Sequence, residues 1–266
     1  MVCGVAIFLE HDIPGQAHQG DGRYLRARTG FDGEVGCVGD DQRGRCRLHG
    51  ADFVGQPEGV SLKSTKGANY TALRPTLEDF VLEMPRGAQV IYPKDLAPIC
   101  MIADIGPGVR VLESGVGSGA LSMTMLRYGA DIIGYEIRED FLNRAHNNVR
   151  SFLGDEVLDR YQLQLRDCYE GIEERDLDRV VLDLPEPWQV VPHAMQALRP
   201  GGILVAYTPS ITQAVQTREA MASKAWNGTR TLEVLHRGWH IEGMSVRPDH
   251  RMVAHTGFLT VGRYIG

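Results

Sequence analysis

Three glycines and one carboxylate in this 266-residue chain stand at the spacing of a nucleoside-binding site. Gly115, Gly117 and Gly119 follow the apolar run 109–112, which predicts a buried strand that ends in a sharp turn. Glycine removes the side chains that would block the turn or keep a ligand away from the backbone. A second predicted strand ends on Glu136, about 20 residues past the turn, where a carboxylate can accept both hydroxyls of a ribose. The pattern therefore predicts a cofactor that carries a nucleoside.

The glycine turn alone leaves the cofactor open. Gly115, Gly117 and Ala120 also match the G-x-G-x-x-G/A pattern of dinucleotide sites, so NAD and S-adenosylmethionine both fit. The segment Asp183-Leu-Pro-Glu-Pro-Trp188 follows a predicted central strand, at the edge where open α/β sheets bind ligands. Its prolines stiffen the loop, and its carboxylate can accept from the exocyclic amine of a base while the indole packs nearby. Hydride transfer has no special need for such a loop, which favours S-adenosylmethionine.

Alternating strands and helices must position these residues. Apolar periodicity predicts a helix that ends at Gly129 and helices at 138–153 and 190–198, with strands at 161–165, 177–184 and 203–207. This order predicts an α/β fold with a mostly parallel sheet and helices on both faces. Two β-rich runs at 231–241 and 256–265, with no long helix between them, predict an antiparallel hairpin that closes the sheet.

The N-terminal part of the chain has a different texture. Residues 1–45 are rich in Gly, Arg and Asp and show little periodicity, which predicts an atypical segment that is open to disorder. Short alternating runs bounded by Gly and Pro predict a small, partial β-domain at 46–80. The alternating α/β pattern then occupies residues 81–266.

Composition narrows the class of protein. Residues are 43% hydrophobic and 23% charged, and no apolar run approaches the roughly 18 residues of a membrane helix. Five cysteines without a C-x-x-C motif predict reduced thiols, and we expect a cytoplasmic protein without a membrane partner. A net charge of −6 excludes a protein coated in basic residues but leaves room for a local basic groove.

Several segments are specific enough to indicate a family. They are Met84-Pro-Arg-Gly-Ala-Gln-Val-Ile-Tyr-Pro-Lys-Asp95, Val111-Leu-Glu-Ser-Gly-Val-Gly-Ser-Gly-Ala-Leu121, Tyr135-Glu-Ile-Arg138, Leu182-Asp-Leu-Pro-Glu-Pro-Trp188, Val205-Ala-Tyr-Thr-Pro209, Arg247-Pro-x-His250 and His255-Thr-Gly-Phe-Leu259. In this order, over roughly residues 50–266, the chain resembles the tRNA (adenine-58-N1)-methyltransferase family. The glycine motif is common to most class I methyltransferases, whereas the other motifs are much more specific.

The resemblance implies a Rossmann-like class I methyltransferase domain at 81–266 behind the small β-domain. It implies S-adenosyl-L-methionine as cofactor, tRNA as substrate, no metal and a homotetramer. Asp183 would be the catalytic acid at the target base, with Tyr92 and Trp188 walling the pocket and Arg247 and His255 on the substrate side. The cofactor would be held by Glu113, Gly115, Gly117, Ser118, Gly119, Ala120, Leu121, Glu136, Phe141, Asp167, Cys168 and Asp183.

Two other classes stay open at this point. One is an NAD-dependent oxidoreductase that uses the same glycine turn. The other is a catalytically silent tRNA-binding subunit, although the intact glycines, Glu136 and Asp183 argue against silence. Lys94 and Arg247 flank the motifs, and a site that takes a base from folded RNA needs cations for the phosphates.

Overall fold

The computed structural model divides the chain into two compact units, Met1–Glu83 and Met84–Gly266. The structure describes residues 6–10, 24–29, 34–38, 47–49, 56–63, 69–87 and 89–266.

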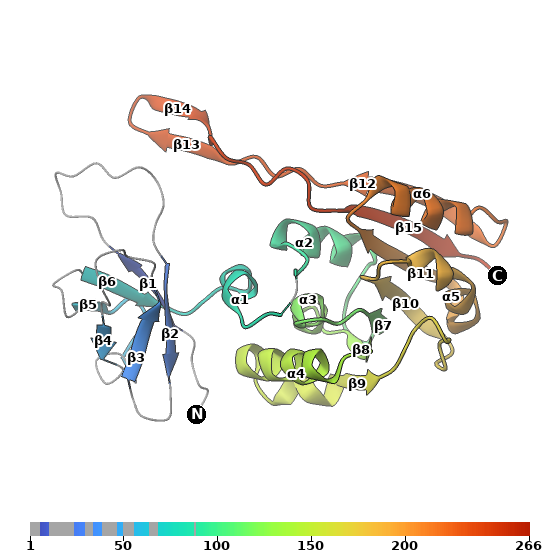
Figure 1. The fold of residues 1–266 in the computed structure, drawn as a ribbon, viewed down its shortest axis with the longest axis horizontal. Helices are drawn as coiled ribbons and strands as arrows, with labels where there is room; N and C mark the ends of the chain where they lie inside the picture. Colours follow the sequence, from blue (N-terminus) through green and yellow to red (C-terminus); the bar gives the residue numbers. More distant parts are fainter. Residues whose placement is uncertain are drawn as a thin grey trace. The chain divides into compact units, whose positions relative to one another are not determined.

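The first unit contains a six-stranded antiparallel sheet with the order β4-β3-β2-β1-β6-β5 (Figure 1). The strands are β1 (Ala6–Glu10), β2 (Tyr24–Thr29), β3 (Glu34–Val38), β4 (Arg47–His49), β5 (Ser61–Lys63) and β6 (Asn69–Leu73). Three of them fall within 1–45, a range that we expected to be atypical and separate from 46–80. Strand β1 pairs directly with β6, so the sheet runs across the expected boundary at residue 45, and the chain divides after Glu83 instead. The rest of 1–45 lies outside the described residues.

A short helix, α1 (Leu77–Glu83), closes the first unit. The backbone N of Thr76 donates to Asp79 Oδ2 at 2.9 Å, and the backbone N of Asp79 donates to Thr76 Oγ1 at 3.2 Å. This reciprocal pair satisfies free N–H groups at the helix start.

The second unit is built on a seven-stranded sheet with the order β12-β15-β11-β10-β7-β8-β9. The strands are β7 (Arg110–Ser114), β8 (Asp131–Glu136), β9 (Tyr161–Leu165), β10 (Leu177–Leu182), β11 (Leu198–Thr208), β12 (Trp226–Glu233) and β15 (Phe258–Tyr264). Neighbours from β11 to β9 are parallel, whereas β15 is antiparallel to both β11 and β12. The predicted Rossmann-like sheet with antiparallel C-terminal strands is therefore confirmed.

Helices cover both faces of this sheet (Figure 1). One face carries α2 (Pro93–Ile102), α3 (Ala120–Arg127) and α4 (Glu139–Leu153), and the other carries α5 (Val191–Ala197) and α6 (Ile211–Ala220). In α4 the buried Phe141, Ala145 and Val149 recur every four residues, so one stripe packs on the sheet. The central strands are apolar on both sides because both faces are covered, with Val111, Leu112, Val180 and Leu204 fully buried.

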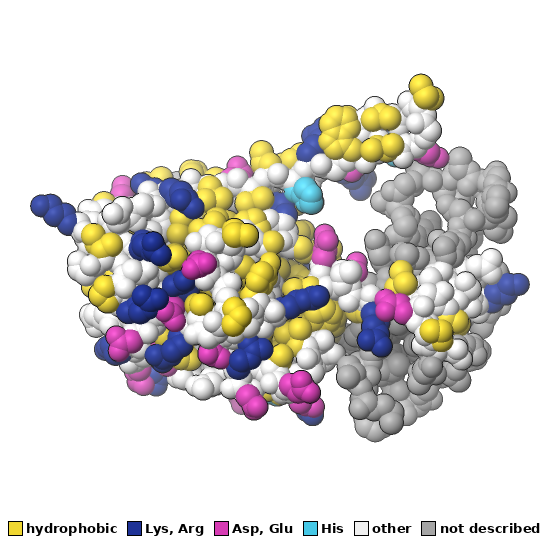
Figure 2. Space-filling view, turned by 180° about the vertical axis from the view of Figure 1, so that it is seen from behind, with side chains coloured by type: hydrophobic (Ala, Val, Ile, Leu, Met, Phe, Trp, Pro, Cys, Tyr) yellow, Lys and Arg dark blue, Asp and Glu magenta, His cyan; other side chains and the backbone are white. Residues whose placement is uncertain are grey.

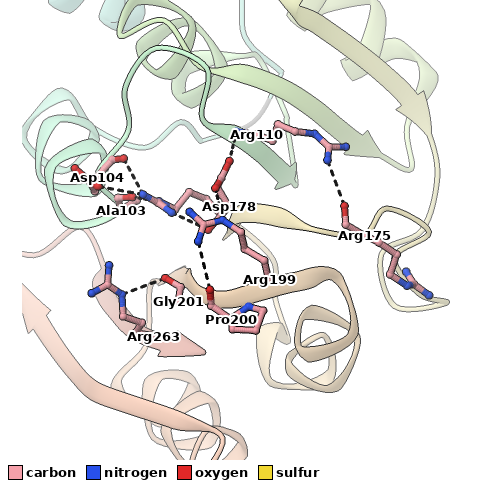
Figure 3. Close-up of polar contacts among 10 residues, drawn as sticks. Ala103, Asp104, Arg110, Arg175, Asp178, Arg199, Pro200, Gly201 and Arg263 are labelled. Carbon is pink, nitrogen blue, oxygen red and sulfur yellow. Dashed lines mark hydrogen bonds and ion pairs between the residues drawn. The ribbon is translucent and has the colours of Figure 1, made fainter. Parts of the chain in front are cut away.

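The amino ends of the central strands are held by an arginine network (Figure 3). Arg179 in β10 is only 4% exposed, and its guanidinium donates to the carbonyl of Ala103 and to Asp104 Oδ2. Asp178 accepts from Arg199 Nε at 2.6 Å and from the backbone N of Arg110 at 2.9 Å. These bonds tie the end of α2 to β7, β10 and β11 at the sheet edge opposite the glycine turn.

The C-terminal β-rich region is more elaborate than the single hairpin that we predicted. The run 231–241 is divided between β12 and a further strand, β13 (Trp239–Glu242), which pairs with β14 (Ser245–Pro248). This hairpin extends beyond the ends of β12 and β15 (Figure 1). Within the described ranges, no helix has the length and apolar character to cross a membrane.

Candidate active site

The glycine turn between β7 and α3 lets the chain pass close to two neighbours. Gly115 has a φ of +83°, and a Cβ there would lie 2.1 Å from the backbone oxygen of Asp183. Gly119 has a φ of +84°, and a Cβ there would lie 3.2 Å from Cα of Ala145 on α4. Residues with a side chain reach this left-handed region only with strain. The glycine pattern thus reflects two close backbone approaches, one to the Asp183 loop and one to α4.

Glu136, at the end of β8, ties the turn down. Its Oε2 accepts from the backbone N of Gly117 at 3.0 Å, and its Oε1 accepts from the backbone N of Arg138 at 3.0 Å. A carboxylate offers roughly four acceptor positions, so acceptor capacity remains for the hydroxyls of a ribose. The structure places Glu136 beside the turn, as the sequence predicted.

Ser118 provides an independent sign that the turn receives a polar ligand. Its side chain is 3% exposed, yet its Oγ has no hydrogen-bond partner among the described residues. Its backbone oxygen accepts from Asn148 Nδ2 at 2.9 Å, which fixes the residue in place. A buried hydroxyl without a partner costs free energy that a bound polar group would recover. The turn therefore fits a nucleoside cofactor with a polar tail. Ala120 and Leu121, two further residues expected at the cofactor, are buried in the first turn of α3.

Glu113 lies beneath the turn. Ser122 Oγ donates to Glu113 Oε2 at 2.6 Å, and the hydroxyl of Tyr161 donates to Ser122 Oγ at 2.9 Å. Burial, assisted by the charges of Asp183 and Glu136 and opposed by the hydrogen bonds from Ser122, raises the pKa of Glu113 to about 8. Glu113 thus uses one oxygen to join β7 to α3, and its contact with a cofactor stays a prediction.

The residues expected near the adenine of the cofactor are Phe141, which follows β8, and Asp167 and Cys168, which follow β9. Phe141 is buried in the first turn of α4, with the guanidinium of Arg138 3.9 Å from the centre of its ring. Asp167 Oδ1 accepts from the backbone N of Tyr169 at 2.8 Å, which shapes the loop after β9. Burial raises the pKa of Cys168 to about 11, so its thiol stays protonated at neutral pH and is no nucleophile.

Asp183 begins the loop that follows β10. Its backbone N donates to the carbonyl of Ser114 at 2.9 Å, which holds the start of the loop against the end of β7. Burial, and then the charge of Glu136, raises the pKa of Asp183 to about 7. Glu136 therefore lies close enough for the two carboxylates to interact, and a positively charged or hydrogen-donating ligand between them would relieve their repulsion.

The rest of the loop is rigid. Gln213 Nε2, on α6, donates to the carbonyl of Pro185 at 2.8 Å, and the backbone N of Glu186 donates to the hydroxyl of Tyr169 at 3.0 Å. Trp188 lies in the short 3-10 helix η3 (Pro187–Gln189) and is partly exposed. The loop thus presents one acid and one indole from a fixed backbone, as the two prolines predicted.

Tyr92 immediately precedes α2 and is half-buried. Sequence reasoning gave no role to Tyr207, near the end of β11, although the electrostatic influence of Tyr92 and Asp183 reaches it. Burial is the first cause that raises the pKa of Tyr207, followed by the charge of Asp95. The sequence signal that could have found it is its position at the carboxyl end of the strand predicted at 203–207, the edge where such sheets bind ligands.

The two cations expected to contact phosphates have different surroundings. Lys94 is not an exposed cation, because its side chain is 7% exposed and its Nζ lies 3.0 Å from Asp95 Oδ1. Arg247 lies on β14 of the hairpin and is not brought to the glycine turn. The ring nitrogens of His255 are taken by Glu233 Oε1 at 2.6 Å and the carbonyl of Pro209 at 2.8 Å, so its side chain is a cross-link. Glu233 is the first cause that raises the pKa of His255.

No metal site was expected from the sequence. In the parts of the chain that the structure describes, no group of three or more His, Cys, Asp and Glu side chains is arranged to hold an ion.

This arrangement defines a class. A parallel sheet with β15 inserted antiparallel, a glycine turn after the central β7 and an acid at the end of β8 is the architecture of class I methyltransferases. The S-adenosylmethionine-dependent O-methyltransferase of Thermotoga maritima superposes with a TM-score of 0.86 at 24% identity, over 100% of this chain and 94% of that one. TrmI of Aquifex aeolicus, a tRNA methyltransferase, superposes with a TM-score of 0.79 at 23% identity, over 100% and 98%.

Sequence comparison narrows the class to one family. The model described as "tRNA methyltransferase complex GCD14 subunit" matches residues 69–247. The tRNA (adenine(58)-N(1))-methyltransferase TrmI of Thermus thermophilus is 38% identical over 218 residues, which cover 81% of this chain and 84% of the relative. The tRNA (adenine(57)-N(1)/adenine(58)-N(1))-methyltransferase TrmI of Methanocaldococcus jannaschii is 34% identical over 232 residues, 77% of this chain and 82% of the relative. The chain belongs to the tRNA (adenine-58-N1)-methyltransferase family, which decides against an NAD-dependent oxidoreductase.

Proposed function

We propose that this protein transfers a methyl group from S-adenosyl-L-methionine to N1 of adenosine 58 in the T-loop of tRNA. The observation that carries the proposal is the juxtaposition of two carboxylates at one sheet edge. Glu136, at the end of β8, secures the glycine turn, and Asp183, close enough for the charge of Glu136 to raise its pKa, starts the rigid loop after β10, on the other side of β7. One acid serves the cofactor and the other serves the base.

The cofactor side is supported by the turn itself. Glu136 would accept the ribose hydroxyls, Ser118 would bond the methionine part through its unpartnered Oγ, and Phe141 would lie against the adenine. Asp167 and Cys168 would meet the adenine edge from the loop after β9. The bound cofactor supplies an activated methyl group on a positively charged sulfur.

The base side rests on Asp183. Its carboxylate would accept from the N6 amine of adenine, which raises electron density at N1 and offsets the positive charge that the methylated base acquires. Because the lone pair of N1 lies in the ring plane, alignment with the methyl carbon supplies most of what the reaction needs. Tyr92 and Trp188 would hold the ring in that alignment, and the rigid loop after β10 keeps the acid in place.

We extend the proposal to the assembly. The β13–β14 hairpin exposes Trp239, Ile241, Met244 and Val246, which are 58–100% exposed. Figure 2 shows hydrophobic side chains gathered on this hairpin. Apolar side chains clustered on a projecting element mark an interaction site, and the homotetramer implied by the family supplies a partner. In that assembly, Arg247 on the same hairpin would contact phosphates of the bound tRNA. Free, buried Cys100 and Cys168 support a cytoplasmic setting.

The test is nucleoside mass spectrometry of tRNA incubated with protein and S-adenosyl-L-methionine. We expect 1-methyladenosine with a transcript that has adenosine at position 58 and none when guanosine replaces it. Transcripts with and without adenosine at position 57 tell whether the neighbouring base is also modified, as the name of the Methanocaldococcus jannaschii relative indicates for that enzyme. Binding of tRNA without any methylation would instead support the silent subunit.

A further inference from the structure

The buried carboxylate of Asp95 is the centre of a hydrogen-bond network that joins three distant segments. Asp95 lies in the first turn of α2 and is 0% exposed. Thr256 Oγ1, just before β15, donates to its Oδ2 at 2.5 Å, and Lys94 Nζ lies 3.0 Å from its Oδ1. Both carboxylate oxygens bond protein groups, and the residue is fully buried, so Asp95 acts on a substrate through its partners.

Those partners lead to the two tyrosines of the base side. The backbone N of Asp95 donates to the carbonyl of Tyr92 at 2.8 Å, which starts α2 directly after that tyrosine. The hydroxyl of Tyr207 donates to the carbonyl of Thr256 at 2.8 Å. Gly257 lies against the same ring, because a Cβ there would come within 2.5 Å of it. A shift of Thr256 would therefore move Tyr207.

The location of Tyr207 connects this network to Asp183. Parallel pairing sets Ala206 of β11 beside Leu182 of β10, so Tyr207 and Asp183 are the next residues of neighbouring chain segments, with Tyr207 still in β11 opposite Leu259. After burial, the charges of Asp95 and Asp183 and the phenol of Tyr92 are among the causes that raise the pKa of Tyr207. The ring thus lies within the electrostatic reach of the acid proposed to accept from the base.

The outer end of the network is anchored as well. Lys94 Nζ donates to the carbonyl of Val234 at 2.7 Å, which attaches α2 to the chain after β12. His255 bridges Glu233, at the end of β12, and Pro209, just after β11. Hydrogen bonds of His255 and of the Thr256 carbonyl therefore fix the segment 255–257. Within this segment, Thr256 is the residue whose side chain bonds Asp95.

We propose that Asp95 is a positioning residue for methyl transfer, and that through Thr256 and the start of α2 it sets Tyr207 and Tyr92 beside Asp183. The inference rests on the proposed function, because it assigns a role within that same site. The role also explains why two distant motifs occur in the same chain. Ile91-Tyr-Pro-Lys-Asp95 and His255-Thr-Gly-Phe-Leu259 are joined by the hydrogen bond from Thr256 to Asp95, and together they position the two tyrosines.

The test compares threonine variants of the full-length protein. Thr256→Val keeps the shape and removes the donated hydrogen bond, and Thr256→Ser restores the hydroxyl. Thr260→Val is the matched control, because Thr260 lies four residues on in β15, is 0% exposed and shares its hydroxyl with Thr231 Oγ1 at 3.0 Å, outside the network. Thermal unfolding, titration with S-adenosyl-L-methionine and single-turnover methylation with saturating tRNA and cofactor are measured for each.

We expect Thr256→Val to slow single-turnover transfer by about tenfold or more, since small displacements of aligned groups cost rate steeply. Its affinity for S-adenosyl-L-methionine should stay within about twofold of wild type, because the cofactor turn is on other strands. Thr256→Ser should recover most of the rate, and Thr260→Val should keep it even if it unfolds at a lower temperature.

Three results would overturn the positioning role. They are an unchanged rate in Thr256→Val, an equal loss in Thr260→Val, and a parallel loss of cofactor affinity that reveals a general structural defect. If wild type itself yields no 1-methyladenosine, the proposed function fails together with this role, whereas active wild type with an unaffected Thr256→Val variant removes the role alone.

Discussion

Replacing Asp183 by asparagine isolates the charge of one side chain at the proposed base site. Asparagine has nearly the same shape, and the backbone N–H that bonds Ser114 is unchanged, so the fold and the cofactor turn should persist. The lost carboxylate can no longer offset the positive charge that develops on the methylated ring. We expect transfer to slow by about 10² or more, the usual scale for losing a preorganised electrostatic partner.

The structure also sets the pH at which this charge is available. Because burial and Glu136 raise the pKa of Asp183 to about 7, the carboxyl of the free enzyme is about one-tenth ionised at pH 6 and about nine-tenths ionised at pH 8. Acceptance from an amine needs the ionised form, so kcat/KM for the cofactor should rise about tenfold between these pH values. In the complex, the positively charged cofactor lowers the pKa of Asp183. The rise in kcat should therefore occur at a lower pH than the rise in kcat/KM.

The assay is single-turnover methylation of tRNA from pH 5.5 to 8.5, at limiting and at saturating S-adenosyl-L-methionine. Glu186→Gln is the control, because Glu186 lies in the same loop and is exposed, and its side chain accepts from Gln189 Nε2 at 2.7 Å, away from Asp183. This variant should keep both the rate and the pH profile. An Asp183→Asn enzyme as fast as wild type, or one that keeps the rise near pH 7, would refute the assignment.

Three further predictions concern the cofactor turn. Glu136→Ala should raise the Kd for S-adenosyl-L-methionine at least about tenfold in calorimetric titration, because the ribose hydroxyls and the N–H of Gly117 lose their acceptor. Unchanged affinity would remove the ribose role. Glu113→Gln should flatten the pH dependence of folding stability. The folded pKa of about 8 lies above the usual 4.5, so wild type loses about 4 kcal/mol of stability as pH rises from 5 to 8.5. Urea unfolding at both pH values checks this, and equal pH slopes for the two proteins would contradict it. Gly115→Ala should cost about 2 kcal/mol or more and weaken cofactor binding, because its Cβ would meet the Asp183 backbone, whereas Gly117→Ala, whose Cβ comes no nearer than 3.9 Å, should cost less.

Much of the second unit could be predicted from local pattern. The strand at 161–165 was predicted with its observed bounds, and the helix expected at 138–153 is observed as Glu139–Leu153. Both are amphipathic or alternating segments whose periodicity is a property of the chain itself. The first unit was harder, because β1 and β6 pair across about sixty residues and neither strand has a strong pattern of its own.

The candidate site divides in the same way. Glu136, Asp183 and the glycines could be assigned because parallel strands bring their carboxyl ends to one edge, so sequence position fixes spatial position. Lys94 and Arg247 were expected at phosphates, but charge alone does not tell whether a side chain meets solvent or a buried partner. Lys94 is buried against Asp95, and Arg247 lies on β14, a strand that falls between the two predicted β-rich runs.

The sequence by itself determined the fold class, the cofactor turn and the two acids, since each depends on residue types at short, fixed spacings. Only the tertiary structure decided that Thr256 donates to Asp95 and that Tyr207 stands near Asp183. Those contacts depend on how α2 and the start of β15 pack on the sheet, and a separation of about 160 residues leaves no local signal of it.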